Sequence, residues 1–419
     1  MHILWLKTEL LHPVDKGGRI RTYNMLRALR REHRVTYLTL DDGTAAPDAA
    51  ERATEEYCHD LVRVPFATAP KRSARFFAEL AANVLSPLPY AVAKYRSTAM
   101  RAAVERAARS GDVDVVVCDF LFPSVNVPDR LGVPTVLFQH NVEAMIWERH
   151  ADVAAGRLKR RYMREQWRRM RRHEADECRR FDHVVAVSPQ DAAAFARDYG
   201  VDASDVPTGV DTEYFRPSGR EAPRPNNLVF TGSMDWMPNE DAVLWFASEI
   251  LPRVRARVPD ATLTVVGRHP PPRVRALADA GRGVEVTGSV PDVRPYMERA
   301  AAFVVPIRVG GGTRLKVYEA MAMEKPLIST PVGAEGLPLR DGVDAILAEE
   351  PGAFADAVVS VLGDPGRARS LAASGAELVR ARYGWDRVAA QFAAACEATA
   401  AGRRPSRSAP ELGTAGVGA

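Results

Sequence analysis

The sequence predicts an α/β protein made of two doubly wound domains, and three observations support this prediction. Short runs rich in Val, Leu and Ile alternate with longer stretches of helical character. The same layout appears twice along 419 residues, a length that exceeds what one hydrophobic core usually organises. A segment rich in Pro, Gly, Arg and Asn, residues 216–227, separates the two series and indicates a linker.

The first series predicts an N-terminal domain over residues 1–215. Continuous apolar strands separated by helices are typical of a parallel sheet covered on both faces. We expect a helix at Arg19–Arg31, directly after the Gly17-Gly18 break. The expected strands are Ile3–Leu6, Val35–Leu40, Leu61–Val64, Val113–Cys118, Thr135–Phe138 and Val184–Val187.

The second series predicts a C-terminal domain over residues 228–384. A helix over 385–400 follows and is expected to pack back on the first domain, and residues 401–419 have the composition of a disordered tail. The cleft between the domains should face the carboxyl ends of the strands, where such folds usually bind ligands. The expected strands are Leu228–Phe230, Leu263–Val266, Val284–Val286, Phe303–Val305, Leu327–Ser329 and Ala345–Leu347.

Composition narrows the functional classes. Hydrophobic content of 46% and charged content of 26% are typical of a globular protein, and a net charge of +4 gives no general case for nucleic-acid binding. Four scattered cysteines without a CxxC pair argue against zinc and favour a reducing compartment. The N-terminal residues resemble a buried strand rather than a secretion signal, and we find no apolar run of about 20 residues. We therefore expect a cytoplasmic protein.

The most specific motif lies near the start of a predicted helix in the second domain. It consists of Gly310, Gly311, Gly312, Thr313, Arg314, Lys316 and Glu319. Glycines let the backbone approach phosphate oxygens, and a helix N-terminus directs free N–H groups at an anion. Arg314 and Lys316 add positive charge, and Glu319 can accept hydrogen bonds from a ribose diol. A tight turn with solvated cations is the alternative, but the combination favours a nucleotide-diphosphate site.

Several further motifs occur in an order that resembles a family 4 glycosyltransferase of the GT-B fold, which has two Rossmann-like domains. The resemblance extends to about Ala400 and is greatest to the polysaccharide-associated sugar transferase group. The motifs that carry it are Gly17–Tyr23, Phe138–Glu143, Val206–Pro217, Thr231–Asn239, Val265–Gly267, Val286–Val290 and Gly310–Ala322.

This resemblance implies a retaining hexosyltransferase that moves a sugar from a nucleotide-diphosphate sugar to an acceptor hydroxyl. Retention in this family is usually pictured as front-face attack, in which the leaving phosphate helps to deprotonate the acceptor. The acceptor would be a glycan, a lipid-linked glycan or a small molecule, in polysaccharide or glycoconjugate synthesis. No cofactor beyond the donor is implied. Asp41-Asp42 and Asp112-Val113-Asp114 are not placed like a donor metal site, so we predict no metal.

Two departures from the family pattern affect the transfer of roles. The family usually has two glutamates eight residues apart in the donor segment; Glu319 matches the second, but Gly311 occupies the first position. The usual Arg and Lys after the first strand of the second domain are absent from Ser233–Asn239. Arg314 and Lys316, with Arg308 as a further candidate, are chemically suited to neutralise the diphosphate instead.

The resemblance and the strand ends indicate further site residues. His140 follows the strand Thr135–Phe138 and is expected to contact the transferred sugar or the acceptor, although a lone histidine is often structural. Gly17 and Gly18 are expected to form a donor-facing loop at a helix N-terminus. The remaining candidate donor contacts, for which plain strand-to-helix loops are the alternative, are Gly232, Ser233, Ser289 and Val290.

The stretch Arg157–Arg180 is strongly basic. It holds eleven Lys or Arg and interleaves Tyr162, Trp167 and Met170. A basic amphipathic helix can lie on an anionic membrane surface, whereas a solvated helix with a core-facing aromatic stripe is an equally good interpretation. A lipid-linked acceptor would favour bilayer contact here.

Two other functional classes fit the sequence. A nucleotide-sugar epimerase can use the same fold and donor pocket, but would convert the donor without an acceptor. A non-catalytic nucleotide-sugar binding protein is the third class, and Gly311 in place of a glutamate keeps it open.

Overall fold

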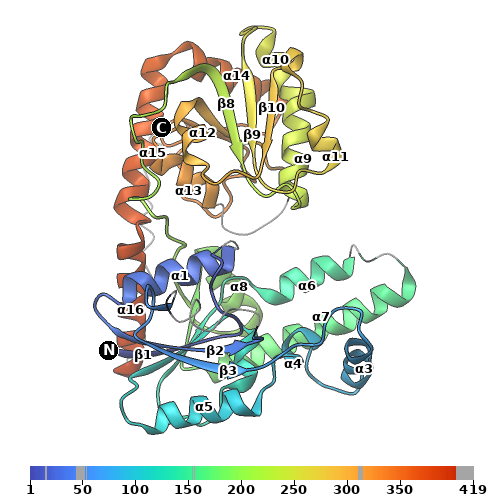
Figure 1. The fold of residues 1–419 in the computed structure, drawn as a ribbon, viewed down its shortest axis with the longest axis vertical. Helices are drawn as coiled ribbons and strands as arrows, with labels where there is room; N and C mark the ends of the chain where they lie inside the picture. Colours follow the sequence, from blue (N-terminus) through green and yellow to red (C-terminus); the bar gives the residue numbers. More distant parts are fainter. Residues whose placement is uncertain are drawn as a thin grey trace, which may run out of the picture. The chain divides into compact units, whose positions relative to one another are not determined.

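The structure is a computed structural model that describes residues 1–14, 17–43, 52, 54–152, 154, 156–309 and 315–402. The chain divides into two compact units (Figure 1). Unit 1 contains Met1–Pro207 together with the chain from Val388 onward, and unit 2 contains Thr208–Arg387. No described helix has both the length and the apolar character needed to cross a bilayer.

Unit 1 is built on a seven-stranded sheet in which all paired strands are parallel, in the order β3-β2-β1-β4-β5-β6-β7. Every strand expected from the sequence is present. The two-residue β7 was not expected, because it is short and polar. The strands are β1 (His2–Lys7), β2 (Arg34–Asp41), β3 (Asp60–Pro65), β4 (Val115–Asp119), β5 (Thr135–Phe138), β6 (His183–Ala186) and β7 (Ser204–Asp205).

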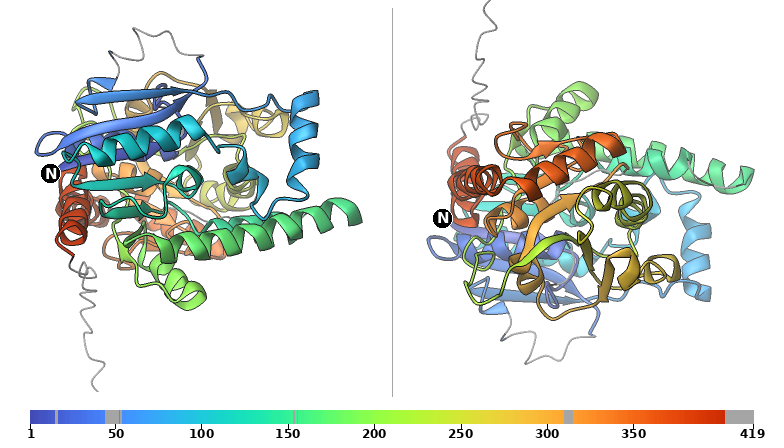
Figure 2. Two further views of the ribbon diagram at one scale, coloured as in Figure 1. Left: turned by 90° about the horizontal axis from the view of Figure 1, so that it is seen from below. Right: turned by 90° about the horizontal axis from the view of Figure 1, so that it is seen from above.

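Helices cover both faces of this sheet, with α1 on one side and α5 on the other (Figures 1 and 2). Three of these helices have a serine N-cap. The hydroxyls of Ser73, Ser97 and Ser188 each accept a hydrogen bond from a backbone N–H of the first turn. The helices are α1 (Gly17–Leu29), α3 (Ala74–Asn83), α4 (Tyr90–Ala93), α5 (Thr98–Arg109), the short 3₁₀ helix η1 (Phe122–Asn126), α6 (Glu143–Asp152), α7 (Arg157–Arg180) and α8 (Pro189–Tyr199).

Unit 2 repeats this architecture with six parallel strands in the order β10-β9-β8-β11-β12-β13. The strands are β8 (Arg224–Thr231), β9 (Thr262–Val266), β10 (Val284–Gly288), β11 (Ala300–Val305), β12 (Leu327–Ser329) and β13 (Ile346–Leu347). The main helices are α9 (Met237–Trp245), α10 (Leu251–Arg255), α11 (Pro272–Arg275), α12 (Arg294–Arg299), α13 (Leu315–Ala322), α14 (Pro351–Gly363) and α15 (Pro365–Arg382).

The segment between the two series differs from the expected linker over 216–227. Strand β8 already begins at Arg224, where Ala300 is its neighbour, so the last four residues of the expected linker belong to the sheet. Residues 208–215, assigned to the first domain from the sequence, belong to unit 2. Val210 explains this, because its backbone N–H binds the carbonyl oxygen of Tyr383 and its side chain joins the core of unit 2.

The last described helix, α16 (Trp385–Ala400), follows α15 and returns the chain to unit 1. The buried ring of Phe392 lies against two strands of the sheet, with its centroid 5.4 Å from that of Trp5 and 4.8 Å from that of Phe138. This aromatic cluster fixes α16 on unit 1. The predicted disordered tail lies, from residue 403 on, outside the described residues.

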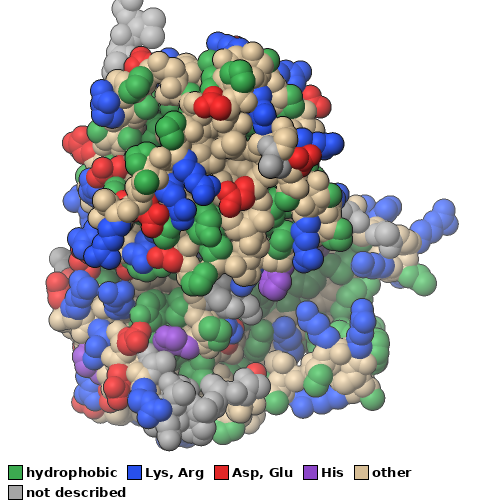
Figure 3. Space-filling view, turned by 45° about the horizontal axis from the view of Figure 1, so that its top comes forward, with side chains coloured by type: hydrophobic (Ala, Val, Ile, Leu, Met, Phe, Trp, Pro, Cys, Tyr) green, Lys and Arg blue, Asp and Glu red, His purple; other side chains and the backbone are tan. Residues whose placement is uncertain are grey.

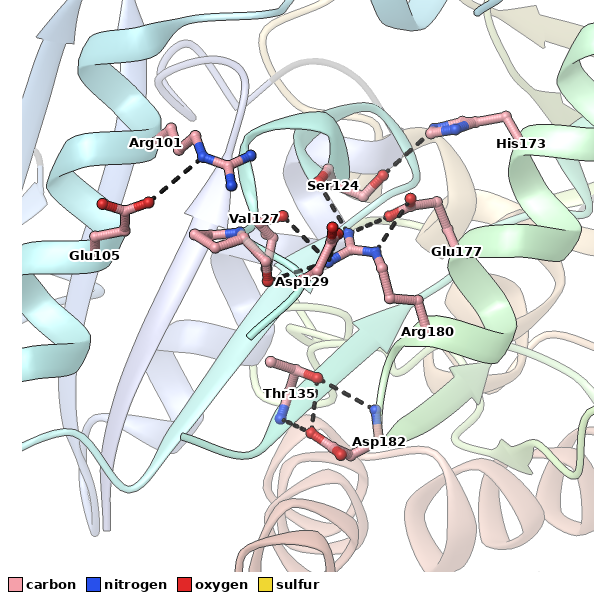
Figure 4. Close-up of polar contacts among 11 residues, drawn as sticks. Arg101, Glu105, Ser124, Val127, Asp129, Thr135, His173, Glu177, Arg180 and Asp182 are labelled. Carbon is pink, nitrogen blue, oxygen red and sulfur yellow. Dashed lines mark hydrogen bonds and ion pairs between the residues drawn. The ribbon is translucent and has the colours of Figure 1, made fainter. Parts of the chain in front are cut away.

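Helix α7 is held at its C-terminal end by Arg180 (Figure 4). The Arg180 guanidinium donates to the carbonyl oxygens of Ser124 and Val127 at 3.2 and 3.1 Å and pairs with Glu177. Two residues after Arg180, the carboxylate of Asp182 accepts hydrogen bonds from the backbone N–H and the hydroxyl of Thr135, both at 2.8 Å. These contacts fasten the end of α7 to η1 and to the start of β5.

We predict that Phe392→Ala lowers the free energy of unfolding of unit 1 by about 3–5 kcal/mol, because the substitution leaves a cavity between α16 and two strands. Urea denaturation followed by circular dichroism measures this change. The matched control is Glu397→Ala on the exposed side of the same helix, which should change stability by about 0.5 kcal/mol or less. An equal effect of the two substitutions would contradict the packing role of Phe392.

Candidate functional site

In both units the polar residues gather where the strand order reverses. Strand β1 lies between β2 and β4 in unit 1, and β8 lies between β9 and β11 in unit 2, so each sheet has a switch point beside its first strand. Open parallel sheets of this kind bind ligands outside the carboxyl ends of the strands at that point.

In unit 1 a buried carboxylate occupies the switch point. Asp119 ends β4 and Lys7 ends β1, and the strand register brings these ends side by side. Asp119 Oδ2 accepts hydrogen bonds from Lys7 Nζ at 2.7 Å, from Thr22 Oγ1 at 2.6 Å and from Trp5 Nε1 at 3.0 Å. Lys7 also donates to Thr22 at 2.8 Å, so the carboxylate ties both strands to α1.

His140 completes this cluster. Its Nε2 lies 2.6 Å from Asp119 Oδ1, and its ring is stacked under that of Phe120, with centroids 3.8 Å apart. Phe120 has a positive φ of 73°, which is rare for an aromatic residue and indicates a constrained turn after β4. A Cβ on Gly18 would lie 2.9 Å from the Phe120 ring, so glycine is required for this close approach.

The charges of this cluster follow from its burial. Burial lowers the pKa of His140 to about 3, and the neighbouring Asp119 only partly offsets this, so the imidazole is neutral. Burial is the largest single influence and raises the pKa of the Asp119 carboxyl, but Lys7 and His140 together outweigh it and hold this pKa below the usual range. Both ring nitrogens of His140 are buried and neither makes a well-directed hydrogen bond to a described residue, although Nε2 faces Asp119 Oδ1. With Nε2 facing Asp119, Nδ1 is the ring nitrogen that remains for a further contact.

A second buried carboxylate holds the segment that carries His140. Glu174 of α7 accepts from the backbone N–H groups of Glu143 and Ala144 at 2.8 and 3.0 Å, at the N-terminus of α6. It also accepts from the hydroxyl of Tyr199 at 2.8 Å and the amide of Gln139 at 3.3 Å. Burial raises the pKa of Glu174 to about 7. The loop between β5 and α6 is thus fixed on both sides of His140.

In unit 2 the switch point holds a lysine beside a glycine loop. Lys316 of α13 donates to Asn239 Oδ1 at 2.6 Å, and its Nζ lies 4.1 Å from the centroid of the Phe230 ring. A Cβ on Gly232, directly after β8, would lie 2.8 Å from Lys316 Nζ. Lys316 therefore brings positive charge to the loop that includes Ser233–Asn239, a segment with no Lys or Arg of its own.

The loop after β8 and the loop after β9 approach each other closely. A Cβ on Gly267, after β9, would lie 1.7 Å from the carbonyl oxygen of Gly232, so only glycine fits there. Ser233 is held by Arg268, whose Nε donates to the serine hydroxyl at 2.9 Å. Asn239 Nδ2 donates to the backbone carbonyl of Ser233 at 2.9 Å. Gly267, Arg268 and Asn239 were not among the predicted site residues.

Glu319 lies on α13, one turn after Lys316. Its side chain is half-buried, and desolvation raises the pKa of its carboxyl to about 7, an effect that Lys316 partly opposes. Near neutral pH this carboxyl can therefore change its charge.

A pocket of about 440 Å³ opens beside the ends of β9 and β10. Ser289 and its preceding glycine contribute to its wall, whereas Val290 packs against the core of unit 2. Their role as donor contacts stays a prediction. The lining residues are His269, Pro270, Arg275, Ala278, Val286, Thr287, Gly288 and Ser289.

The remaining predicted residues fall into three groups. Gly17 begins α1, and a Cβ there would meet nothing among the described residues, so this helix start is open. Arg308 forms a bidentate pair with Asp241 and lies over the Trp245 ring, and its role at the diphosphate stays a prediction. Gly310, Gly311, Gly312, Thr313 and Arg314 lie outside the described residues.

We predict that Lys7→Met lowers the free energy of unfolding of unit 1 by about 3–5 kcal/mol, because it leaves the Asp119 carboxylate buried without its cation. Adding Asp119→Asn should restore part of this loss, since the uncompensated charge disappears. Urea unfolding of both single variants and the double variant measures the coupling. Additive effects would show that the 2.7 Å contact contributes no specific interaction.

Solved structures share this fold over almost their whole length. Sucrose-phosphate synthase from Thermosynechococcus elongatus superposes with a TM-score of 0.64 at 17% identity, covering 94% of this chain and 97% of that one. Anabaena Alr3699/HepE, solved in complex with UDP, gives 0.62 at 15% identity over 94% and 98%. At these identities the similarity concerns the fold, which is GT-B.

Sequence relatives are similar over part of the chain. D-inositol 3-phosphate glycosyltransferase 2 of Catenulispora acidiphila is 28% identical over 51% of this chain and 55% of its own length. Phosphatidyl-myo-inositol mannosyltransferase of Mycobacterium tuberculosis is 30% identical over 46% of this chain and 53% of its own. The chain thus spans about half the length of these relatives.

Two family models match consecutive parts of the chain. The model described as Glycosyltransferase Family 4 matches residues 16–214, which include the Asp119–His140 cluster. The model described as Glycosyl transferases group 1 matches residues 225–364, which include Lys316 and Glu319. With this order of domains and a GT-B fold, the chain belongs to the family 4 glycosyltransferases.

Proposed function

We propose that this protein is a retaining hexosyltransferase that moves a sugar from a nucleotide-diphosphate sugar to an acceptor hydroxyl, without a divalent ion. The position of Lys316 carries the proposal. Its ammonium group lies against the glycine loop after β8, at the switch point of unit 2, where it would meet a diphosphate with positive charge.

The donor nucleotide would bind to unit 2. Gly232 and Gly267 let the loops after β8 and β9 approach each other and Lys316 closely. Lys316, with Arg314 on the sequence evidence, would balance the charge that grows on the leaving diphosphate. Glu319 would accept hydrogen bonds from the ribose diol. The base would occupy the pocket of about 440 Å³ beside Ser289, which is large enough for it.

Unit 1 would contact the transferred sugar and hold the acceptor. The neutral His140 ring, kept in place by Asp119 and Phe120, offers Nδ1 as an acceptor for a sugar hydroxyl. A neutral ring suits binding rather than proton abstraction, because a group with a pKa of about 3 is a weak base near neutral pH. The leaving phosphate would instead take the acceptor proton, which is the front-face route to retention.

The named relatives support the substrate classes. One neighbour in fold was solved with UDP, and two relatives bear names that specify inositol phosphate or phosphatidyl-inositol as the sugar acceptor. An acceptor hydroxyl on a glycan, a lipid-linked glycan or a phosphorylated polyol is consistent with these names.

We predict that one of the uridine, guanosine, adenosine or thymidine diphosphate sugars raises the melting temperature of the full chain. Stabilisation follows mass action and is about 2.7 kcal/mol at a ligand concentration of 100 times Kd. The shift should disappear in Arg314→Ala and Lys316→Ala, which remove charge from the diphosphate. Arg253→Ala, an exposed cation on α10, is the matched control and should retain it.

The same preparations test the reaction. Release of free nucleotide should require an acceptor and persist in EDTA, whereas donor conversion without acceptor would identify an epimerase. Tight donor binding without release to any glycan, lipid-linked glycan or polyol phosphate would indicate a binding protein. No thermal shift with any nucleotide sugar would contradict the proposed donor site.

We predict that donor affinity rises with pH through Glu319. If the ribose diol binds the ionised carboxyl, whose pKa in the free protein is about 7, affinity should be about tenfold higher at pH 8 than at pH 6. Titration calorimetry with the intact nucleotide sugar measures this, because its diphosphate does not titrate in that range. Glu319→Gln should flatten the dependence. An unchanged slope in Glu319→Gln would assign the effect to another group.

A further inference from the structure

Helix α3 of unit 1 presents an apolar face to solvent. Phe77 is 57% exposed, and Val84 and Leu85, which follow the helix, are 61% and 92% exposed. Only small residues lie between them on this face: Ala74, Ala78, Ala81 and Ala82, all exposed. The charged residues of α3, Arg75 and Glu79, pair with each other at 2.8 Å away from this face. Water-soluble helices normally bury such a face, so its exposure indicates an interaction site.

The N-terminal half of α7 extends this face. Leu158 is 86% exposed, and Tyr162 is 37% exposed. Leu158, Tyr162 and Val84 line one groove between α7 and the end of α3, and Figures 1 and 2 show these helices side by side. We refer to Phe77, Val84, Leu85, Leu158 and Tyr162 as the apolar patch.

The two helices form one rigid surface. Arg169 of α7 donates to the carbonyl oxygens of Asn83 and Val84 at 2.7 and 3.0 Å. Gln166 binds Asn83 with its amide nitrogen at 3.2 Å and accepts from the backbone of Tyr90 at 2.8 Å. Arg169 is therefore a structural residue, and the end of α3 is fixed on α7.

Exposed cations surround the apolar patch, and blue and green side chains lie together on this side of unit 1 in Figure 3. Between residues 157 and 168 only Glu165 is acidic, and it pairs with Arg169 at 2.9 Å. The exposed cations just before α3 and in the N-terminal half of α7 are Lys71, Arg72, Arg157, Lys159, Arg160, Arg161, Arg164 and Arg168. The cations at the other end of α7 differ, because Arg179 and Arg180 bind backbone carbonyls of unit 1.

We propose that this surface docks unit 1 on an anionic lipid bilayer, with the apolar patch entering the boundary between headgroups and acyl chains. Leucine and phenylalanine side chains on one face and a rim of arginines are the two features that interfacial helices combine. Each cation near an anionic surface adds about fivefold to binding, and the apolar side chains supply the part that salt does not screen. The proposal is independent of the sugar-transfer reaction.

Charge favours a bilayer over a second copy of this chain. An isologous dimer through the apolar patch would bring its rim of cations against the same rim of the other copy. Such like-charge contacts oppose association, whereas anionic headgroups complement them.

Sedimentation of the full chain with vesicles tests the proposal. The protein should bind vesicles of phosphatidylcholine mixed with phosphatidylglycerol, and bind vesicles of phosphatidylcholine alone at least about tenfold more weakly. Leu85→Ser with Leu158→Ser should reduce binding about tenfold or more, because both leucines leave water on docking. Their exposure means that folding should be unaffected, which circular dichroism checks.

Two charge variants complete the experiment. Arg161→Gln with Arg164→Gln should weaken binding about 25-fold and reduce its salt dependence. Arg106→Gln with Arg109→Gln on α5 removes the same charge from another exposed helix of unit 1 and should change binding little. Equal losses in both charge variants would overturn the proposal, as would unchanged binding of the leucine variant. A stable dimer that the leucine variant dissociates would assign the apolar patch to self-association and also overturn it.

Discussion

The carboxylate of Asp119 is the constraint on which the arrangement of unit 1 depends. It is fully buried, and a buried charge is tolerated only where cations and hydrogen-bond donors surround it. Those donors come from β1 and α1, and the ring of His140 comes from the loop after β5. Satisfying this single charge therefore fixes three separate chain segments relative to one another. The same contacts hold His140 in place, whereas its burial keeps the ring neutral against the pull of Asp119. In the proposed function this neutral ring would bind a sugar hydroxyl without exchanging a proton.

Unit 2 uses its charges differently. Lys316 donates to the amide oxygen of Asn239, lies over the ring of Phe230 and approaches Gly232 in the loop after β8. The lysine of unit 1 instead lies 2.7 Å from a buried carboxylate. Two sheets with the same strand order thus reach different chemistry at the same topological position. Fold alone does not decide this; the charged residues that reach each switch point do.

The sequence predicts the strands and the division into two series because apolar runs reveal buried parallel strands directly. It predicts His140, Lys316, Glu319 and Ser289 through motifs. It does not predict the partners of Lys7 or Asp119, because each is one charged residue at a strand end and only the register of β1 and β4 brings them together. Arg180 shows the same limit: in sequence it is one more cation in a basic run, whereas its carbonyl partners lie more than 50 residues earlier. Interactions between distant segments are set by the tertiary fold.

Helix α7 links the two proposed roles of unit 1. Its C-terminal half holds the His140 loop through Glu174, and its N-terminal half carries Leu158 and the exposed arginines. A helix rises about 1.5 Å per residue, so Leu158 and Glu174 are on the order of 24 Å apart along one continuous helix. If the N-terminal half of that helix rests on a bilayer, the same helix connects the membrane contact to the loop that carries His140. The proposed docking would therefore set the orientation of the unit 1 site relative to the bilayer surface.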